Sequence, residues 1–119
     1  MNPILLAVLA FLESSGDPTV VNGKAVGLYQ ITPILVQDVN RFAGTSYTPD
    51  DRYDPVKSAE MVVLYVKHYL SDNPSVGEAA ALWRCGPTGM KNPTPGQQRY
   101  IARATALAAN WPATRSPKT

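Results

Sequence analysis

Repeated helix-start signals are the feature that most constrains how this chain of 119 residues can fold. Among the dipeptides in which a proline follows a residue whose side chain can cap a helix, three stand directly before an apolar segment: Asn2-Pro3, Thr32-Pro33 and Asp54-Pro55. Proline suits the first helical position because the N–H that it lacks would be unpaired there. A fourth start follows Ser75, which can form a capping box with Glu78. These signals predict a succession of short helices.

Apolar residues at three- and four-residue steps follow each signal and predict how far each helix extends. Helices are expected from Pro3 to a stop at 15–16, from Pro33 to Gly44, over 55–70 as the central packing helix, from Ser75 to a break at 85–87, and over 97–110. Turn-forming residues predict a loop or short hairpin over 17–25 and a loop over 86–96. The fold class is therefore mainly α, with at most a small hairpin.

The composition is that of one globular domain. Hydrophobic residues make up 45% and charged residues 17% of the chain, which is enough apolar material for a core. We expect a single domain over 1–111, a monomer, and a flexible tail over 112–119. The formal net charge of +2 comes without a run of like charges, so nucleic acid is not indicated. A DNA-binding alternative would rest on three arginines alone: Arg99, Arg103 and Arg115.

The sequence predicts no zinc site, no disulfide and no membrane-spanning segment. With Cys85 and His68 as the only cysteine and histidine, neither a disulfide nor a zinc site is predicted. The apolar run over 4–12 is much shorter than the roughly 20 residues that cross a membrane. No basic residue precedes this run, so it does not read as a signal peptide, and we interpret it as a buried helix.

Glu13 is the carboxylate most suited to acid–base chemistry. It follows the most apolar segment and falls in the last turn of its predicted helix, where apolar surroundings and the helix dipole both disfavour ionisation. A raised pKa would let Glu13 act as a general acid near neutral pH. The alternative is an exposed glutamate at a helix end.

Several motifs resemble those of lytic transglycosylases of the lysozyme-like superfamily. They are Glu13-Ser14-Ser15-Gly16-Asp17-Pro18, then Gly27-Leu28-Tyr29-Gln30-Ile31, then Ala81-Leu82-Trp83-Arg84-Cys85-Gly86-Pro87, and the late Tyr100. The resemblance covers about residues 3–108, with the motifs in the family's order. It implies a lysozyme-like fold of about five helices around a central helix, an enzyme without a cofactor, and peptidoglycan as the substrate.

The resemblance also implies roles for individual residues. Glu13 would be the single catalytic acid and base, and the substrate would bind to Ser14, Tyr29, Gln30, Trp83, Arg84 and Tyr100. Tyr29 replaces the family's methionine as a flat surface for a sugar ring, Trp83 replaces a tyrosine, and Arg84 replaces an asparagine. Gln30 has no evident structural task in the sequence, which favours a functional one.

The expected reaction is cleavage between N-acetylmuramic acid and N-acetylglucosamine, with 1,6-anhydromuramoyl ends. Hydrolysis ordinarily takes two carboxylates, and no acid lies between Asp17 and Asp38, where hydrolytic goose-type relatives place theirs. A muramidase is the first alternative. The second is a non-catalytic glycan-binding or virion-type structural domain of the same fold. The site of action would be the cell wall, with either a phage or a bacterium as the source.

Overall fold

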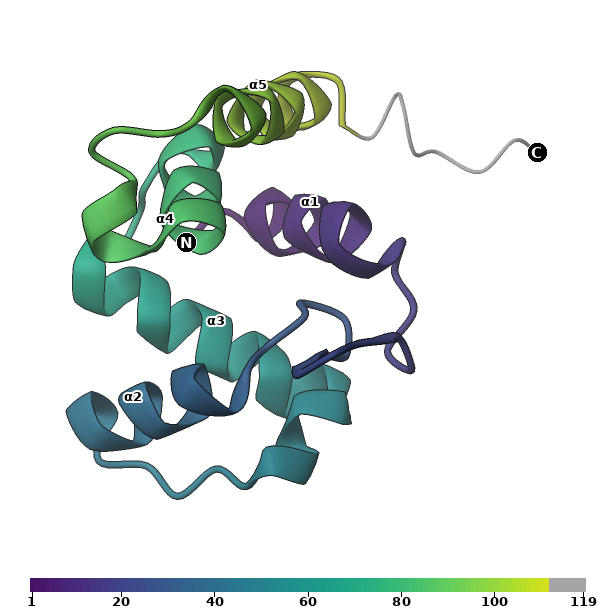
Figure 1. Ribbon diagram of the computed structural model, residues 1–119, viewed down its shortest axis with the longest axis vertical. Coiled ribbons are helices and arrows are strands. Elements are labelled where there is room, and N and C mark those ends of the chain that lie inside the picture. Colours follow the sequence, from purple (N-terminus) through teal and green to yellow (C-terminus); the bar gives the residue numbers. More distant parts are fainter. Residues whose placement is uncertain (112–119) are drawn as a thin grey trace.

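The computed structural model describes residues 1–111, and these form a mainly helical domain (Figure 1). Its elements in chain order are α1 (Pro3–Ser14), β1 (Val21–Asn22), β2 (Ala25–Val26), α2 (Pro33–Ala43), the 3-10 helix η1 (Pro49–Tyr53), α3 (Pro55–Tyr69), α4 (Val76–Gly89) and α5 (Pro95–Ala109). The predicted fold class, five helices with a small hairpin, is confirmed. The expected tail over 112–119 lies outside the described residues.

The capping residues act as predicted at the helix starts. The Asn2 side chain accepts a hydrogen bond from the Ile4 N–H, and the Asp54 side chain accepts from the two N–H groups of Val56 and Lys57. Ser75 and Glu78 form the reciprocal capping box. Each bond satisfies a backbone donor that has no partner within its own helix, so the element boundaries follow from local chemistry.

Two predicted boundaries near the C-terminal end were wrong. The last helix begins at Pro95 instead of Gln97, because the side chains of Thr94 and Gln97 form a capping box at its start. The segment 86–96 is not all loop, since a helical turn resumes after Gly86, whose φ of 79° and ψ of 168° interrupt α4. Pro87 stands at the start of that turn, where proline is tolerated.

The hydrophobic core joins all five α-helices. Fully buried side chains come from α1 (Leu5, Val8, Leu9), α2 (Val39), α3 (Met61, Val62, Val66), α4 (Ala79, Ala80, Leu82) and α5 (Ala104). Helix α4 packs against α1, α3 and α5, while α3 also packs against α2 and η1. In Figure 1, α1, α4 and α5 therefore form one half of the molecule, α2 and η1 lie on the opposite side of α3, and the hairpin lies below the end of α1.

The hairpin and the loop after it make a tight structure beside the end of α1. Val21 pairs with Val26 and Asn22 with Ala25, and Val26 then pairs with Ile31 through an isolated bridge. Gly27 has a φ of +85°, and a Cβ at this position would overlap the Arg52 carbonyl oxygen of η1. This close backbone approach requires glycine and joins the loop to the half of the molecule that contains η1.

Candidate active site

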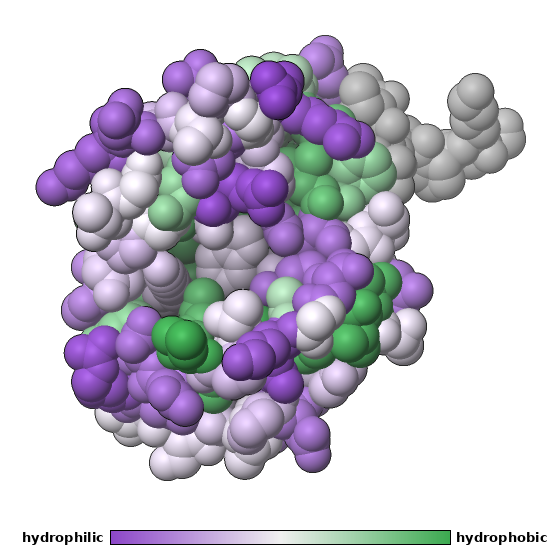
Figure 2. Space-filling model, in the orientation of Figure 1, coloured by the Kyte–Doolittle hydropathy of each residue, from purple (hydrophilic) through white to green (hydrophobic). Residues whose placement is uncertain are grey.

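A groove of about 490 Å³ lies between the two halves of the molecule. Figure 2 shows the surface hollowed there, with polar residues along both rims. Four of the predicted site residues line the groove: Glu13, Gln30, Trp83 and Arg84. They come from α1, from the loop after the hairpin and from α4, so the fold brings together segments that are distant in sequence.

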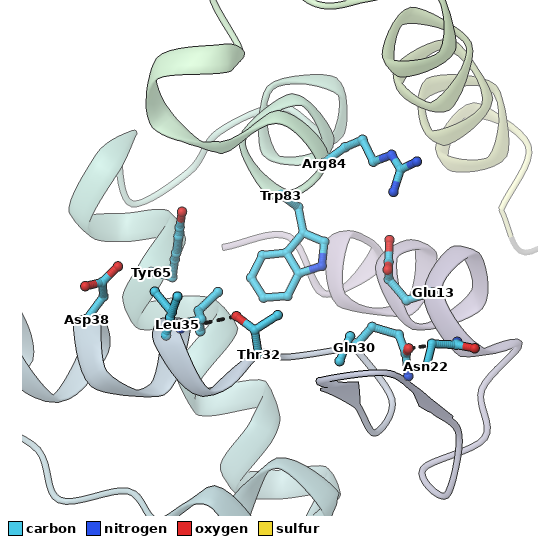
Figure 3. A pocket seen from close by; sticks show the side chains of 11 residues that line it. Glu13, Asn22, Gln30, Thr32, Leu35, Asp38, Tyr65, Trp83 and Arg84 are labelled. Carbon is cyan, nitrogen blue, oxygen red and sulfur yellow. Dashed lines mark hydrogen bonds between the residues drawn. The ribbon is translucent and has the colours of Figure 1, made fainter.

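Glu13 points from the last turn of α1 toward the groove (Figure 3). Its side chain is partly buried, and the Tyr100 hydroxyl of α5 donates a 2.5 Å hydrogen bond to its Oε2. Burial raises the pKa of Glu13 and outweighs the hydrogen bond from Tyr100 and the charge of Arg84, which both lower it. The predicted raised pKa is confirmed, and burial is its largest cause.

Tyr100 and Arg84 complete a cluster around this carboxyl. The Arg84 guanidinium carbon lies 5.6 Å from the centre of the Tyr100 ring, within the range of a cation–π contact. Burial and the neighbouring Glu13 raise the pKa of Tyr100 well above its usual value, so its hydroxyl stays protonated and remains a donor. The cluster can therefore stabilise Glu13 when that side chain is ionised.

Trp83 lies at the centre of the groove in Figure 3. Its indole Nε1–H donates a 3.1 Å hydrogen bond to the Tyr29 carbonyl oxygen. The Tyr65 ring of α3 also lines the groove and meets the Trp83 ring edge-on, with centroids 5.7 Å apart. These two rings give the groove an aromatic surface of the kind on which sugar rings can rest.

Gln30 has a structural task, contrary to the sequence-based expectation. Its φ of 56° is unusual for a residue other than glycine. Its side-chain amide donates to the Val20 and Gly27 carbonyl oxygens at 3.1 and 3.0 Å, and its side-chain oxygen accepts from Asn22 at 2.9 Å. These bonds hold the loop together, while Gln30 still lines the groove.

Two other residues do not take the positions that the resemblance implies. Tyr29 is only 5% exposed and belongs to the hydrophobic core, so its ring offers no surface to a sugar. Ser14 is 8% exposed, and its hydroxyl donates to the Ala10 carbonyl oxygen one turn earlier in α1. Neither residue is among those lining the groove.

The other acids near the groove have partners of their own. Asp38 lines the end of the groove away from Glu13 in Figure 3, and its Oδ1 accepts a 2.9 Å bond from Arg41. Asp17 accepts from both the N–H and the hydroxyl of Thr19, which lowers its pKa. Asp17 is thus a residue of the turn that follows α1.

Sequence reasoning missed several residues that line the groove: Asn22, Thr32, Asp38 and Tyr65. Thr32 was assigned only its capping role, which it also performs through a 3.3 Å bond from the Leu35 N–H. Tyr65 stands next to the core residue Val66 on α3. The sequence around Tyr65 does not indicate that its ring lines a groove, because the groove depends on how α3 and α4 pack.

The part of the chain that the structure describes contains neither a metal-binding cluster nor a membrane-spanning helix. Within 1–111, no three side chains of His, Cys, Asp or Glu gather in a way that could hold a metal ion. His68 stacks on the Phe42 ring with centroids 3.8 Å apart, and Cys85 is partly buried. No helix over the same range is both long and apolar enough to span a membrane.

Five helices, a small hairpin and a carboxyl in a groove are consistent with the lysozyme-like fold. The family model described as "Transglycosylase SLT domain" matches residues 1–103, which include both Glu13 and Tyr100. The chain therefore belongs to the SLT transglycosylase family, whose activity is of the lytic transglycosylase type on peptidoglycan. Searches of curated proteins and of solved structures gave no match.

Proposed function

We propose that this protein is a lytic transglycosylase that cleaves the β-1,4 bond between N-acetylmuramic acid and N-acetylglucosamine at the cell wall. Glu13 is its single acid and base, and the products carry 1,6-anhydromuramoyl ends. The observation that supports this proposal best is the Glu13 carboxyl itself, which lines the groove, has a raised pKa and accepts a hydrogen bond from Tyr100. It is open to the groove, and it holds its proton more tightly than an exposed glutamate does, which favours the role of a general acid.

In the first step, protonated Glu13 gives its proton to the glycosidic oxygen. The bond between that oxygen and C1 of the muramoyl sugar breaks, and its electron pair stays with the leaving oxygen. An oxocarbenium-like centre develops at C1. As Glu13 becomes a carboxylate, the Tyr100 hydroxyl and the Arg84 charge stabilise it.

In the second step, the C6 hydroxyl of the same sugar attacks C1 and closes the 1,6-anhydro ring. The Glu13 carboxylate takes the proton that this hydroxyl releases, which returns the enzyme to its starting state. No water is consumed, so no second carboxylate is needed to activate one. Asp38, bound to Arg41 at the other end of the groove, has no part in this scheme.

We further propose that the groove holds the sugar chain through aromatic and polar groups together. Trp83 and Tyr65 supply ring surfaces, and Gln30 and Asn22 add amide groups on the side of the hairpin. Such a mixture suits a polysaccharide, whose rings have apolar faces and hydroxyl edges.

A hydrolytic muramidase is the second candidate, and Asp38 is the observation that favours it, since it is another carboxylate in the same groove. Mass spectrometry of digested peptidoglycan separates the two reactions. A transglycosylase releases muropeptides with anhydro ends, each lighter by one water than the corresponding reducing end. Release of reducing ends alone would replace our proposal with the muramidase.

The assignment of the acid is tested by Glu13→Gln, which keeps the shape of the side chain but cannot donate the proton. We expect turnover to fall at least a thousandfold, on the order of what loss of an essential catalytic group causes, while the variant still binds cell-wall sacculi. Ordinary activity in this variant would refute the role of Glu13. A wild-type protein that binds sacculi without releasing any fragment would instead indicate a non-catalytic glycan-binding domain.

A further inference from the structure

Arg84 is the one cation among the described residues that line the groove. It leaves α4 directly after Trp83, and in Figure 3 its guanidinium extends toward the side of the groove where Glu13 lies. Its side chain is exposed, and its position over the Tyr100 ring restricts where the charge can sit. A positive charge therefore borders the place where the bond would be cleaved.

This charge has no anionic partner bound to it within residues 1–111. The two ion pairs of that range are Arg41 with Asp38 and Lys57 with Asp51. Glu13 is close enough to interact with Arg84 electrostatically, but it must be protonated, and thus uncharged, when it acts as the acid. Asp38, at the other end of the groove, is paired with Arg41. The end of the groove that holds Arg84 therefore carries a positive charge when substrate binds.

We infer that Arg84 binds a carboxylate carried by the lactyl arm of the muramoyl sugar next to the scissile bond. This inference rests on the proposed function and names a specificity-determining residue for it. Muramic acid differs from the neighbouring glucosamine by this arm, whose carboxyl group is free in peptide-stripped strands. In strands with stem peptides, the arm carries the carboxylates of the peptide. The planar guanidinium suits either one, because it can donate two parallel hydrogen bonds to a carboxylate.

The test compares three substrates with the same sugar backbone. The first has intact stem peptides, the second has free lactyl carboxylates, and the third has those carboxylates converted to neutral amides. We expect wild-type kcat/KM to be about tenfold or more higher on a carboxylate-bearing strand than on the neutral one, the effect typical of one charge-assisted hydrogen-bonded pair. The first two substrates distinguish a peptide carboxylate from the lactyl carboxylate.

Arg84→Gln should remove this preference. Its loss of kcat/KM on carboxylate-bearing strands should exceed its loss on neutral strands by about tenfold. Arg84→Lys keeps the charge and should retain part of the preference. Arg103→Gln is the matched control, because Arg103 also lies over an aromatic ring, that of Phe11, but does not line the groove.

Two results would overturn the inference. One is equal wild-type kcat/KM on all three strands, a measurement that needs no variant to fold. The other is an equal loss in Arg84→Gln on charged and neutral strands, which would limit Arg84 to its contacts with Glu13 and Tyr100. Failure of the proposed function would look different, because the wild-type protein would then release no anhydro ends from any strand.

Discussion

At the scale of single residues, the site depends on how one carboxyl balances burial against its neighbours. Burial raises the pKa of Glu13, and Tyr100 and Arg84 partly offset this effect. Without burial the carboxyl would be ionised at neutral pH and could not donate a proton. Without Tyr100 and Arg84 it would give up its proton less readily. Burial together with these two side chains sets the pKa of Glu13 above that of an exposed glutamate.

Tyr100→Phe should weaken this balance in a measurable direction. The substitution removes the hydrogen bond that stabilises ionised Glu13, so the pKa of Glu13 rises further. We expect kcat to fall about 10- to 100-fold, and the loss of activity at high pH to begin at a higher pH than in the wild type. Tyr53→Phe, on the exposed Tyr53 of η1, should change neither quantity. An unchanged pH profile in Tyr100→Phe would contradict the assigned contact.

The same burial has a cost for folding, which Glu13→Gln should reveal. Because the pKa of Glu13 is higher in the folded than in the unfolded protein, the folded state binds more protons. Stability is thus fully present below the unfolded pKa and decreases as the pH rises through the folded pKa. Glutamine does not ionise, so the variant should be more stable than the wild type near neutral pH, and this advantage should disappear below about pH 4. Thermal unfolding of the wild type and the variant at several pH values measures the stability difference near neutral pH and its disappearance at low pH.

At the scale of elements, the hairpin and its loop are positioned by backbone contacts that a side chain would disrupt. Gly27 combines a positive φ with close contact to the Arg52 backbone. Arg52 in turn donates to the Lys24 and Ile31 carbonyl oxygens at 2.8 and 3.1 Å. Gln30 belongs to this loop and lines the groove. The contacts of η1 with the loop therefore help to position a residue of the groove.

Gly27→Ala should therefore destabilise the protein strongly. Left-handed strain and overlap with the Arg52 carbonyl act together, and we expect the free energy of unfolding to fall by about 2–4 kcal/mol. The control is Gly23→Ala, where φ is +61° but no atom lies within 4 Å of the added Cβ. This variant should lose only about 1 kcal/mol. Equal losses in denaturant unfolding would mean that the close contact is unimportant.

At the scale of the whole molecule, the groove exists because segments far apart in the chain meet across it. The hydrogen bond from Tyr100 to Glu13 joins residues 87 positions apart, and that from Trp83 to the Tyr29 carbonyl joins residues 54 positions apart. The second bond links α4 to the loop after the hairpin and so connects the two sides of the groove. It stabilises the shape in which a substrate would bind.

Trp83→Phe tests this connection, since it keeps an aromatic ring but removes the indole N–H. The Tyr29 carbonyl then loses a donor, and we expect the free energy of unfolding to fall by about 1 kcal/mol. Trp83→Ala also removes the ring that meets Tyr65 and should cost about 2 kcal/mol more. A phenylalanine variant as stable as the wild type would show that the hydrogen bond does not hold the two sides together.

The sequence by itself determined the five α-helices and most of their starts, and it singled out Glu13. Caps such as Asn2 and Asp54 act on donors two or three residues away, so their effect can be predicted from neighbouring letters. The raised pKa of Glu13 was also predictable, because the apolar segment before it implies burial. The start of α5 follows the same local rule, since the capping box of Thr94 and Gln97 lies within four residues.

Tertiary structure alone decided which side chains face the groove. Tyr29 and Gln30 are adjacent in sequence, yet Tyr29 is buried in the core while Gln30 bonds to its own loop and lines the groove. Tyr65 reaches the groove although it lies beside the core residue Val66. The direction of a side chain depends on the backbone angles and packing of segments distant in sequence. A motif can therefore mark the region of a site while leaving the orientation of its residues to the fold.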